Sequence, residues 1–289
     1  SGKKPVVRKK VVKSQGSGAK GESGRVFTPT AEAKSKATTL RIIAVVAWVI
    51  AIGAELATIF WILRQDPIKM WLLIVAIVVM GIFALTGGLL WKKANRYDPA
   101  SKANKLKFWL WNNLGVIVTA IAFIPLIVLI LLNKDMDGKQ KGLAAGLAAV
   151  IAIAVGLASY DWNPVSQEQY AHEQNIVEQL TGVNEVYWVK NGSVFHVCDA
   201  VPDVNKESKD NRIYSGTVAE AHEKGMDRLT LKWESEAVNY CGITQEKVDE
   251  VKAAVADDGT GVEDSDVTGD EVDEPMDEPA DEESVETTE

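Results

Sequence analysis

Two long apolar runs, separated by a short polar segment, constrain this chain more than any other feature of its sequence. The first run covers residues 40–63 and contains one acidic residue, Glu55, while the second covers residues 70–91 and contains no charged residue. Each run is long enough to cross a hydrocarbon core of roughly 30 Å as a helix. Because that core offers no water to backbone polar groups, such runs must be helical. The sequence therefore predicts a membrane hairpin.

Two more apolar runs follow, at residues 108–132 and 142–159. The segments between the runs are short, so the helices should alternate in direction across the bilayer. The predicted fold class is a membrane all-α domain of four transmembrane helices over residues 39–160, followed by a small soluble α+β domain over residues 161–255.

Charge is segregated toward the two ends of the chain. Residues 1–41 contain eleven Lys and Arg against two acids, whereas residues 257–289 contain sixteen Asp and Glu and no base. Neither end has enough large apolar side chains to offset the entropy of ordering it. We therefore expect a disordered basic arm over residues 1–38 and a disordered acidic tail over residues 256–289. The arm should lie against anionic lipid headgroups. Nucleic-acid binding is not expected, because no aromatic residue is interleaved with its bases before Phe27.

The distribution of bases also predicts how the spans are oriented. The basic arm and the loop at residues 92–107 hold most of the bases, whereas the connectors at residues 64–69 and 133–141 hold few and balance them with Asp. Bases in short flanks favour the cytoplasmic side. With four spans, both the N-terminus and the C-terminal domain are expected to be cytoplasmic. The absence of Lys and Arg from residues 160–189 opposes this orientation.

Capping and turn residues outline the start of the C-terminal domain. Ser166 precedes a helical pattern that should end at Gly182. Asn191-Gly192 separates two alternating β-prone runs, which is typical of a tight hairpin. Thr217 then opens a second capping-box pattern, which predicts a short helix.

The rest of the domain gives weaker patterns. Residues 199–214 are predicted to form a polar loop, and the alternation of Leu229, Leu231 and Trp233 predicts a further strand. The segment that passes Cys241 should end in a helix. A domain of this size, under about 90 residues, is near the lower limit for an independent core, so we expect it to dock against the membrane or a partner.

Three polar residues of the spans are candidate sites. An ionisable group inside a span is a functional candidate by default, so Glu55 could serve a small transporter or channel component. The other three runs contain no acidic residue and no histidine, so a proton relay would lack partners. A structural role is favoured, with Glu55 protonated or hydrogen-bonded across a helix interface. Asn112 and Asn113 lie near the inner interface and are expected to support helix packing. In the fourth run, Gly142 and Gly146 permit close approach of another helix.

The C-terminal domain contains potential metal ligands. His196 and Cys198 would share one face of a strand, and with His222 and Cys241 they could form a zinc site. Because no Cys-x-x-Cys pair is present, zinc is the weaker interpretation. Buried thiols are more probable on sequence grounds, as is a Cys198–Cys241 disulfide if the domain faces outward.

The stretch YDWNPVSQEQY, followed by VYWVKNGSVFHVC and YSGTVAEAHEKG, resembles a family of actinobacterial four-span membrane proteins with a small C-terminal domain. Such proteins often carry further cysteines near the positions of Asp199 and Trp233. This chain has no cysteine there, which weakens the case for a metal site carried over from the family. The order of arm, spans, domain and tail is also similar to that of an accessory subunit of the actinobacterial respiratory supercomplex, which joins a cytochrome bc-type complex to an aa-type oxidase.

This resemblance implies a location in the bacterial inner membrane, cytochrome bc-type and oxidase subunits as partners, and no haem or copper in the chain. The four runs contain no histidine, so a bis-His haem or a copper centre cannot be built from them. No catalytic motif is apparent either. We therefore expect a non-catalytic accessory or assembly subunit without a cofactor. Two alternatives stay open: a small transporter or channel component using Glu55, and a membrane-anchored binding module.

Overall fold

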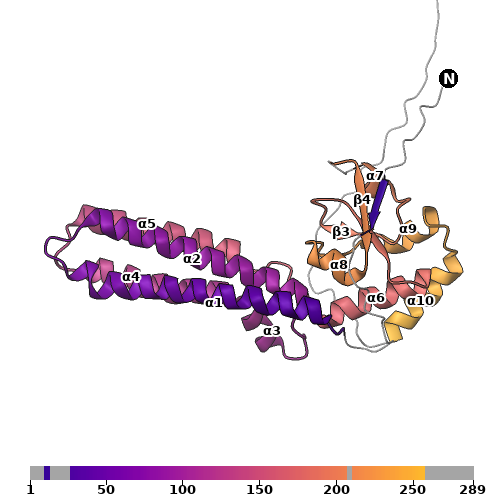
Figure 1. Ribbon diagram of the computed structural model, residues 1–289, viewed down its shortest axis with the longest axis horizontal. Coiled ribbons are helices and arrows are strands. Elements are labelled where there is room, and N and C mark those ends of the chain that lie inside the picture. The colour runs from indigo at the N-terminus through magenta and orange to yellow at the C-terminus, as the bar shows by residue number, and fades with distance from the viewer. Residues whose placement is uncertain (1–9, 14–26, 207–209, 258–289) are drawn as a thin grey trace, which may run out of the picture.

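The computed structural model describes residues 10–13, 27–206 and 210–257. Figure 1 shows a rod of long helices with a more compact domain at one end. Four helices of the described part are long and apolar enough to cross a membrane, which confirms the predicted number of candidate spans. They are α1 (Ala31–Phe60), α2 (Met70–Tyr97), α4 (Leu114–Leu132) and α5 (Gly138–Ser159).

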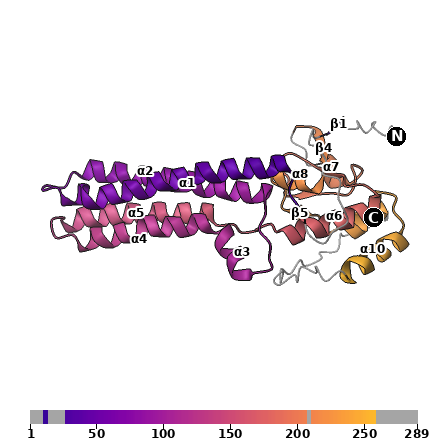
Figure 2. The same cartoon turned by 60° about the horizontal axis from the view of Figure 1, so that its bottom comes forward.

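The helices run up and down, as the short connectors predicted. In both Figure 1 and Figure 2 the α1–α2 and α4–α5 connectors lie together at the end of the rod that is far from the domain. Asn133 Nδ2 donates a hydrogen bond to the carbonyl oxygen of Leu63 there, over 3.3 Å. Helix α2 lies centrally, because it packs against α1, α4 and α5. Its buried side chains join an apolar core that includes Leu73, Ile77 and Phe123.

Small residues hold α2, α4 and α5 close together near the domain end. A Cβ atom added at Gly115 would lie 2.8 Å from Cα of Gly88, and one added at Gly88 would lie 2.2 Å from Oγ of Ser159. Lipid tails are as apolar as the helix surfaces, so helices in a bilayer associate largely through close packing of this kind. Glycine is therefore required where these backbones meet.

The third apolar run is not one helix, contrary to its prediction as a single span. A separate helix, α3 (Lys105–Asn112), ends at Asn113, and α4 begins directly after it. Both views show α3 projecting sideways from the rod. The break was hidden from the sequence, because apolar residues continue on both sides of Asn112 and Asn113.

The prediction of a disordered arm over residues 1–38 is wrong for two stretches. Helix α1 begins at Ala31, where the Thr30 side chain accepts a hydrogen bond from the Ala33 N–H, and α1 projects beyond the apolar run. Residues Lys10–Lys13 form strand β1, which pairs in parallel with a strand of the C-terminal domain. This pairing between distant segments supplies backbone partners that the arm alone lacks. Residues 1–9 and 14–26 of the predicted arm lie outside the described residues.

The C-terminal domain begins as its capping residues predicted. Helix α6 (Gln167–Thr181) starts where Ser166 Oγ accepts from the Gln169 N–H over 3.0 Å, and it ends at Gly182 with a φ of +78°. Helix α8 (Val218–Glu223) has the capping box opened by Thr217. Asn191 has a φ of +66° in a turn that brings two antiparallel segments together.

Other parts of the domain differ from their predictions. The expected loop over residues 199–214 contains helix α7 (Pro202–Lys206) and the start of strand β4 (Arg212–Gly216). The predicted strand from Leu229 to Trp233 stops early, at β5 (Arg228–Leu229), because the chain turns at Thr230 and α9 (Trp233–Asn239) follows.

The described strands form two small sheets. Strand β4 lies between β1 and β2 (Val186–Trp188), parallel to the first and antiparallel to the second. Strand β3 (Val194–Phe195) pairs in parallel with β5. The predicted final helix is α10 (Gln245–Asp257), which packs against α6. It enters the predicted acidic tail by two residues, and the rest of that tail lies outside the described residues.

Candidate functional site

A buried polar network joins α1, α2 and α3 at the end of the bundle nearest the domain. Arg41 donates from Nη1 to Asp98 Oδ2 over 2.7 Å, and from Nη2 to the Asp98 carbonyl oxygen over 2.8 Å and to Asn95 Oδ1 over 3.3 Å. Asn95 donates to Asn112 Oδ1 over 3.1 Å, and Asn112 Nδ2 donates to the Phe108 carbonyl oxygen. Asn112 therefore links helices, as expected.

Aromatic rings surround the guanidinium of Arg41. It lies 5.7 Å from the ring centroid of Trp91 and 5.2 Å from that of Trp111. Trp91 also packs against Trp48, and its indole N–H donates to the Trp111 carbonyl oxygen over 2.8 Å. Cation–π contacts strengthen when water is excluded, so the rings help to retain the arginine at this depth.

Asn113 fixes the break between α3 and α4 to the end of α5. Its Nδ2 donates to the Trp109 carbonyl oxygen over 3.1 Å, and its Oδ1 accepts from the Asp161 N–H over 3.2 Å. Beside this contact, Lys92 Nζ donates to the Tyr160 carbonyl oxygen. Burial raises the pKa of Asp161, against the opposing effect of the positive charge on Lys92. Asn113 thus supports helix packing, as predicted.

Helix α2 is bonded directly to the C-terminal domain. Arg96 Nη2 pairs with Asp227 Oδ1 over 2.9 Å, and its carbonyl oxygen accepts from the Tyr170 hydroxyl over 2.9 Å. Gln169 Nε2 donates to the Asp227 carbonyl oxygen over 3.0 Å. These contacts explain why the last turn of α2 lies against the domain in Figure 1.

A second tether connects the loop after α2 to the start of α6. Ser101 Oγ donates to Glu168 Oε1, and the Lys102 N–H donates to Glu168 Oε2 over 2.9 Å. Burial alone would raise the pKa of Glu168, but the hydrogen bonds from Ser101 and Lys102 outweigh it and hold that pKa below its usual range. The bundle and the domain are therefore joined at several independent points.

Behind these tethers lies a buried histidine–carboxylate pair. His222 is fully buried, with Nε2 2.5 Å from Glu173 Oε2 and Nδ1 3.0 Å from the Met226 carbonyl oxygen. A carbonyl oxygen can only accept, so Nδ1 carries a proton. Glu173 Oε1 accepts from the Leu229 N–H over 3.1 Å. Tyr170 stacks on the imidazole at 3.9 Å between centroids, and burial raises the Tyr170 pKa well above its ordinary value.

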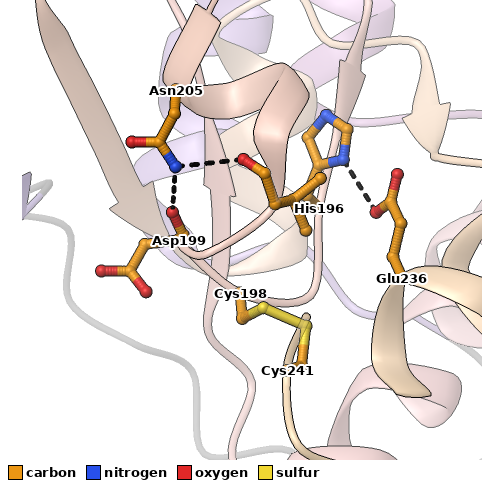
Figure 3. The surroundings of a disulfide bond; sticks show 7 residues. His196, Cys198, Asp199, Asn205, Glu236 and Cys241 are labelled. Atoms are coloured by element: carbon orange, nitrogen blue, oxygen red, sulfur yellow. Dashed lines mark hydrogen bonds and ion pairs between the residues drawn. A yellow bond between two sulfur atoms is a disulfide. The ribbon is translucent and has the colours of Figure 1, made fainter. Parts of the chain in front are cut away.

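His196 and the two cysteines make a separate set of contacts in the domain. Cys198 and Cys241 are joined by a disulfide with a Cα–Cα distance of 5.8 Å. Figure 3 shows His196 directed toward Glu236 on α9, and their Nδ1 and Oε2 atoms are 2.9 Å apart. Asn205 on α7 donates to the Asp199 carbonyl oxygen next to the disulfide. The disulfide therefore links the loop after β3 to the segment after α9.

The residues of the weaker zinc interpretation do not converge. Cys198 and Cys241 are bonded to one another, and His196 and His222 bind different carboxylates, Glu236 and Glu173. Within residues 10–13, 27–206 and 210–257, no group of three or more His, Cys, Asp and Glu side chains is placed to hold a metal ion.

Glu55 lies on the inward face of α1, 4% exposed, one turn from Ala51 and from Thr58. No other described residue forms a hydrogen bond or ion pair with its carboxyl group. The hydrogen bond across a helix interface that its structural interpretation included is therefore not formed between described residues.

Gly142 and Gly146 lie on the outward face of α5. A Cβ atom added at either position would have no neighbour within 4 Å. The small residues that α5 buries are instead Ala144, Ala145, Ala148 and Ser159. Within the part of the chain that the structure describes, the two glycines therefore do not pack against another helix.

Several residues of these polar contacts were not singled out from the sequence: Arg41, Asn95, Arg96 and Glu173. Their signals were present but faint. Arg41 is a base just inside an apolar run, and Asn95 is an amide four residues after the end of another. Their partners lie tens of residues away, so the sequence pattern did not reveal the contacts.

Comparison with known proteins gives no match to the chain, whether the comparison is with protein-family models, with curated proteins or with solved structures.

Proposed function

We propose that this chain is a non-catalytic accessory or assembly subunit of a larger membrane complex. The observation that carries the proposal is the unoccupied small-residue surface of α5 at Gly142 and Gly146. By contrast, four glycines of the bundle pack closely against side chains or backbone of its other helices: Gly81, Gly87, Gly88 and Gly115. A matching surface that faces away from the bundle suits a helix of another subunit.

The contacts between the bundle and the C-terminal domain support the same proposal. Arg96 and Glu168 tie the bundle and the domain together, so the domain is held in a fixed position at the membrane surface. A domain that is held in a fixed position against the bundle suits a subunit that positions neighbouring subunits. Catalysis would require an accessible group of reactive side chains, and the paired histidines are buried.

The complex that fits best is an actinobacterial respiratory supercomplex in the bacterial inner membrane, with cytochrome bc-type and oxidase subunits as partners. This part rests on the resemblance of the arm, spans, domain and tail. The test is purification of the tagged chain in mild detergent, followed by an absorption spectrum and mass spectrometry. We expect cytochrome bands and their subunits in fixed stoichiometry. Recovery of a colourless, monomeric chain would refute the proposal.

A pair of variants tests the surface on α5. Replacement of both glycines, Gly142→Leu with Gly146→Leu, should release the partner subunits while the chain still inserts. The control is Gly53→Leu on α1, which also has no neighbour within 4 Å and is exposed. Equal retention of partners by both proteins would show that the surface on α5 is not the contact.

We further propose that the arm and the C-terminal domain are cytoplasmic. The Lys and Arg residues beside the spans favour that side. The disulfide favours the opposite side, because disulfides persist in oxidising compartments. We give the bases more weight, because they act while the chain inserts. The Cα atoms of the two cysteines lie 5.8 Å apart, a distance that permits a disulfide, but the same pair remains as thiols in a reducing compartment.

Alkylation in intact cells separates the two orientations. Cells are treated with a membrane-permeant maleimide before lysis, without reductant. On the cytoplasmic side Cys198 and Cys241 should be modified. If they react only after reduction, and a reporter fused after residue 255 is also active outside, the domain faces outward.

A second candidate function is a transporter or channel component, favoured by the buried carboxyl group of Glu55, with which no other residue of the described ranges forms a hydrogen bond or ion pair. Glu55→Gln preserves size and removes the ionisable group. Loss of a proton or ion flux in vesicles, with assembly intact, would favour this function over the subunit proposal.

A further inference from the structure

Helix α3 differs from the other helices of the bundle in direction and in surface. It lies where the chain enters α4, and Figure 2 shows it directed away from the rod. One side of α3 carries three exposed apolar residues: Leu106 is 68% exposed, and Trp109 and Leu110, three and four positions further along the helix, are 48% and 41% exposed. Phe108 and Asn112, on the other side, are buried against the bundle. An apolar face at the entry to a span is typical of a helix that lies in the membrane interface.

A groove runs between α3 and the first turn of α4, and its surface is mainly apolar. We call it the α3–α4 groove. The residues that line it are Asn104, Leu106, Lys107, Leu110, Trp111 and Leu114. The exposed face of α3 shares Leu106 and Leu110 with the groove, so an occupant could extend from the groove onto the bilayer side.

The charged residue among those that line the groove is a base, Lys107. Lys105 and Lys107 are exposed on α3, and the sequence contains no Asp or Glu between Asp98 and Asp135. The cation at the edge of the groove is Lys107, while the lining beyond it is apolar. A ligand complementary to this arrangement has an anionic head and an apolar chain.

We propose that the α3–α4 groove binds an anionic phospholipid, with its phosphate at Lys107 and one acyl chain along Leu110 and Leu114. A membrane lipid is favoured over a peptide because the groove lies where α4 enters the bilayer, and Trp109 is an aromatic residue suited to headgroup level. The site differs from the expected contact of the N-terminal arm with lipid headgroups, because it is built from α3 and α4. It is also independent of the subunit proposal.

Photolabelling of the full chain tests the location. The protein is reconstituted in phosphatidylcholine nanodiscs that contain a phosphatidylglycerol probe with a diazirine in its acyl chain. Labelled peptides should cover residues 106–114, and unlabelled phosphatidylglycerol should compete while added phosphatidylcholine should not. Labelling spread evenly along the lipid-facing helices, or equal competition by the two lipids, would overturn the proposal.

Variants test the chemistry of the site. Lys107→Glu should lower labelling of residues 106–114 by at least about tenfold, because the change replaces the base at the lipid phosphate with an acid. The control, Lys141→Glu, changes a base at the opposite end of the bundle and should leave this labelling unchanged. Leu110→Trp, which fills the groove and keeps the charge, should also lower it. Unaltered labelling in both groove variants would refute the site.

Discussion

The bundle and the C-terminal domain of this chain solve the problem of a stable core in different ways. The bundle exposes many of its apolar side chains, and three of its helices meet closely at Gly88, Gly115 and Ser159. The domain is small and buries ionisable groups in pairs, with a disulfide beside them. Its pairs are His222 with Glu173 and His196 with Glu236.

The difference follows from the surroundings of each region. In lipid, apolar burial gives little net attraction between helices, so close backbone packing must supply it. In water, apolar burial drives folding, but a domain of fewer than about 100 residues has little of it to spare. Cross-links and paired buried groups then contribute a larger share. Four predictions test this comparison, from the largest expected effect to the smallest.

The largest effect is expected where a buried pair in the domain loses one charge. Glu173→Gln removes the carboxylate that faces His222 Nε2, and such changes cost roughly 3–5 kcal/mol. Hydrogen exchange measured by mass spectrometry on the full chain should show faster opening of α6 and α8, while α2 and α4 stay protected. The control is Glu178→Gln on the same helix, which is partly exposed and should change little.

Loss of the cross-link should come next. In oxidised, purified protein, Cys198→Ser removes a bond that closes a loop over a sequence separation of 43 residues. Chain entropy predicts a cost of roughly 4 kcal/mol, although measured losses are often smaller. The same exchange experiment should report it in α9 and the loop after β3. Reduced wild type should behave like the variant; if it retains full protection, the cross-link is not what stabilises this region.

In the bundle, a single methyl group should matter only where backbones touch. Gly115→Ala places a Cβ 2.8 Å from Cα of Gly88, and overpacking of this kind costs roughly 1–3 kcal/mol. Gly142→Ala has open space and should be neutral or slightly stabilising. Thermal unfolding of the two variants in the same detergent gives the difference. Equal melting temperatures would mean that close packing at Gly115 does not support the bundle.

The smallest effect concerns the tether between the two regions. The pKa of Glu168 is lowered in the folded chain, so its carboxylate adds stability at pH values above its unfolded pKa of about 4.3, and this stability is lost as the pH falls through the lower folded value. Because solvent screens the group, we expect less than about 1 kcal/mol.

Exchange at the start of α6, corrected for intrinsic rates, should increase below about pH 4 in wild type. Glu168→Gln should be weaker at neutral pH and should lack this acid transition. An identical pH profile in the two proteins would remove Glu168 from the tether.

Features set by local sequence were predictable. The four spans follow from hydropathy, since a bilayer admits an isolated apolar run only as a helix. The starts of α6 and α8 follow from Ser166 and Thr217, whose hydroxyls accept from N–H groups three residues on. The turn at Asn191 follows from the tolerance of Asn for a positive φ.

Contacts between distant residues were not predictable in this way. Arg41 and Asp98 are 57 positions apart, and Glu173 and His222 are 49 apart. Strand β1 needs β4 beside it, and the two lie about 200 residues apart in the sequence. The break at Asn113 depends on its bond to the Asp161 N–H, which hydropathy cannot reveal.

The sequence by itself determined that the chain has four helices long and apolar enough to cross a membrane, and where its local caps and turns lie. Those features depend on hydropathy and on hydrogen bonds within a few residues. Only the tertiary structure decided which polar groups pair, that Cys198 meets Cys241, and which glycines pack inward. Those outcomes depend on how separate elements converge. Gly115 and Gly142 illustrate this: both are glycines in apolar helices, and only the fold buries one and exposes the other.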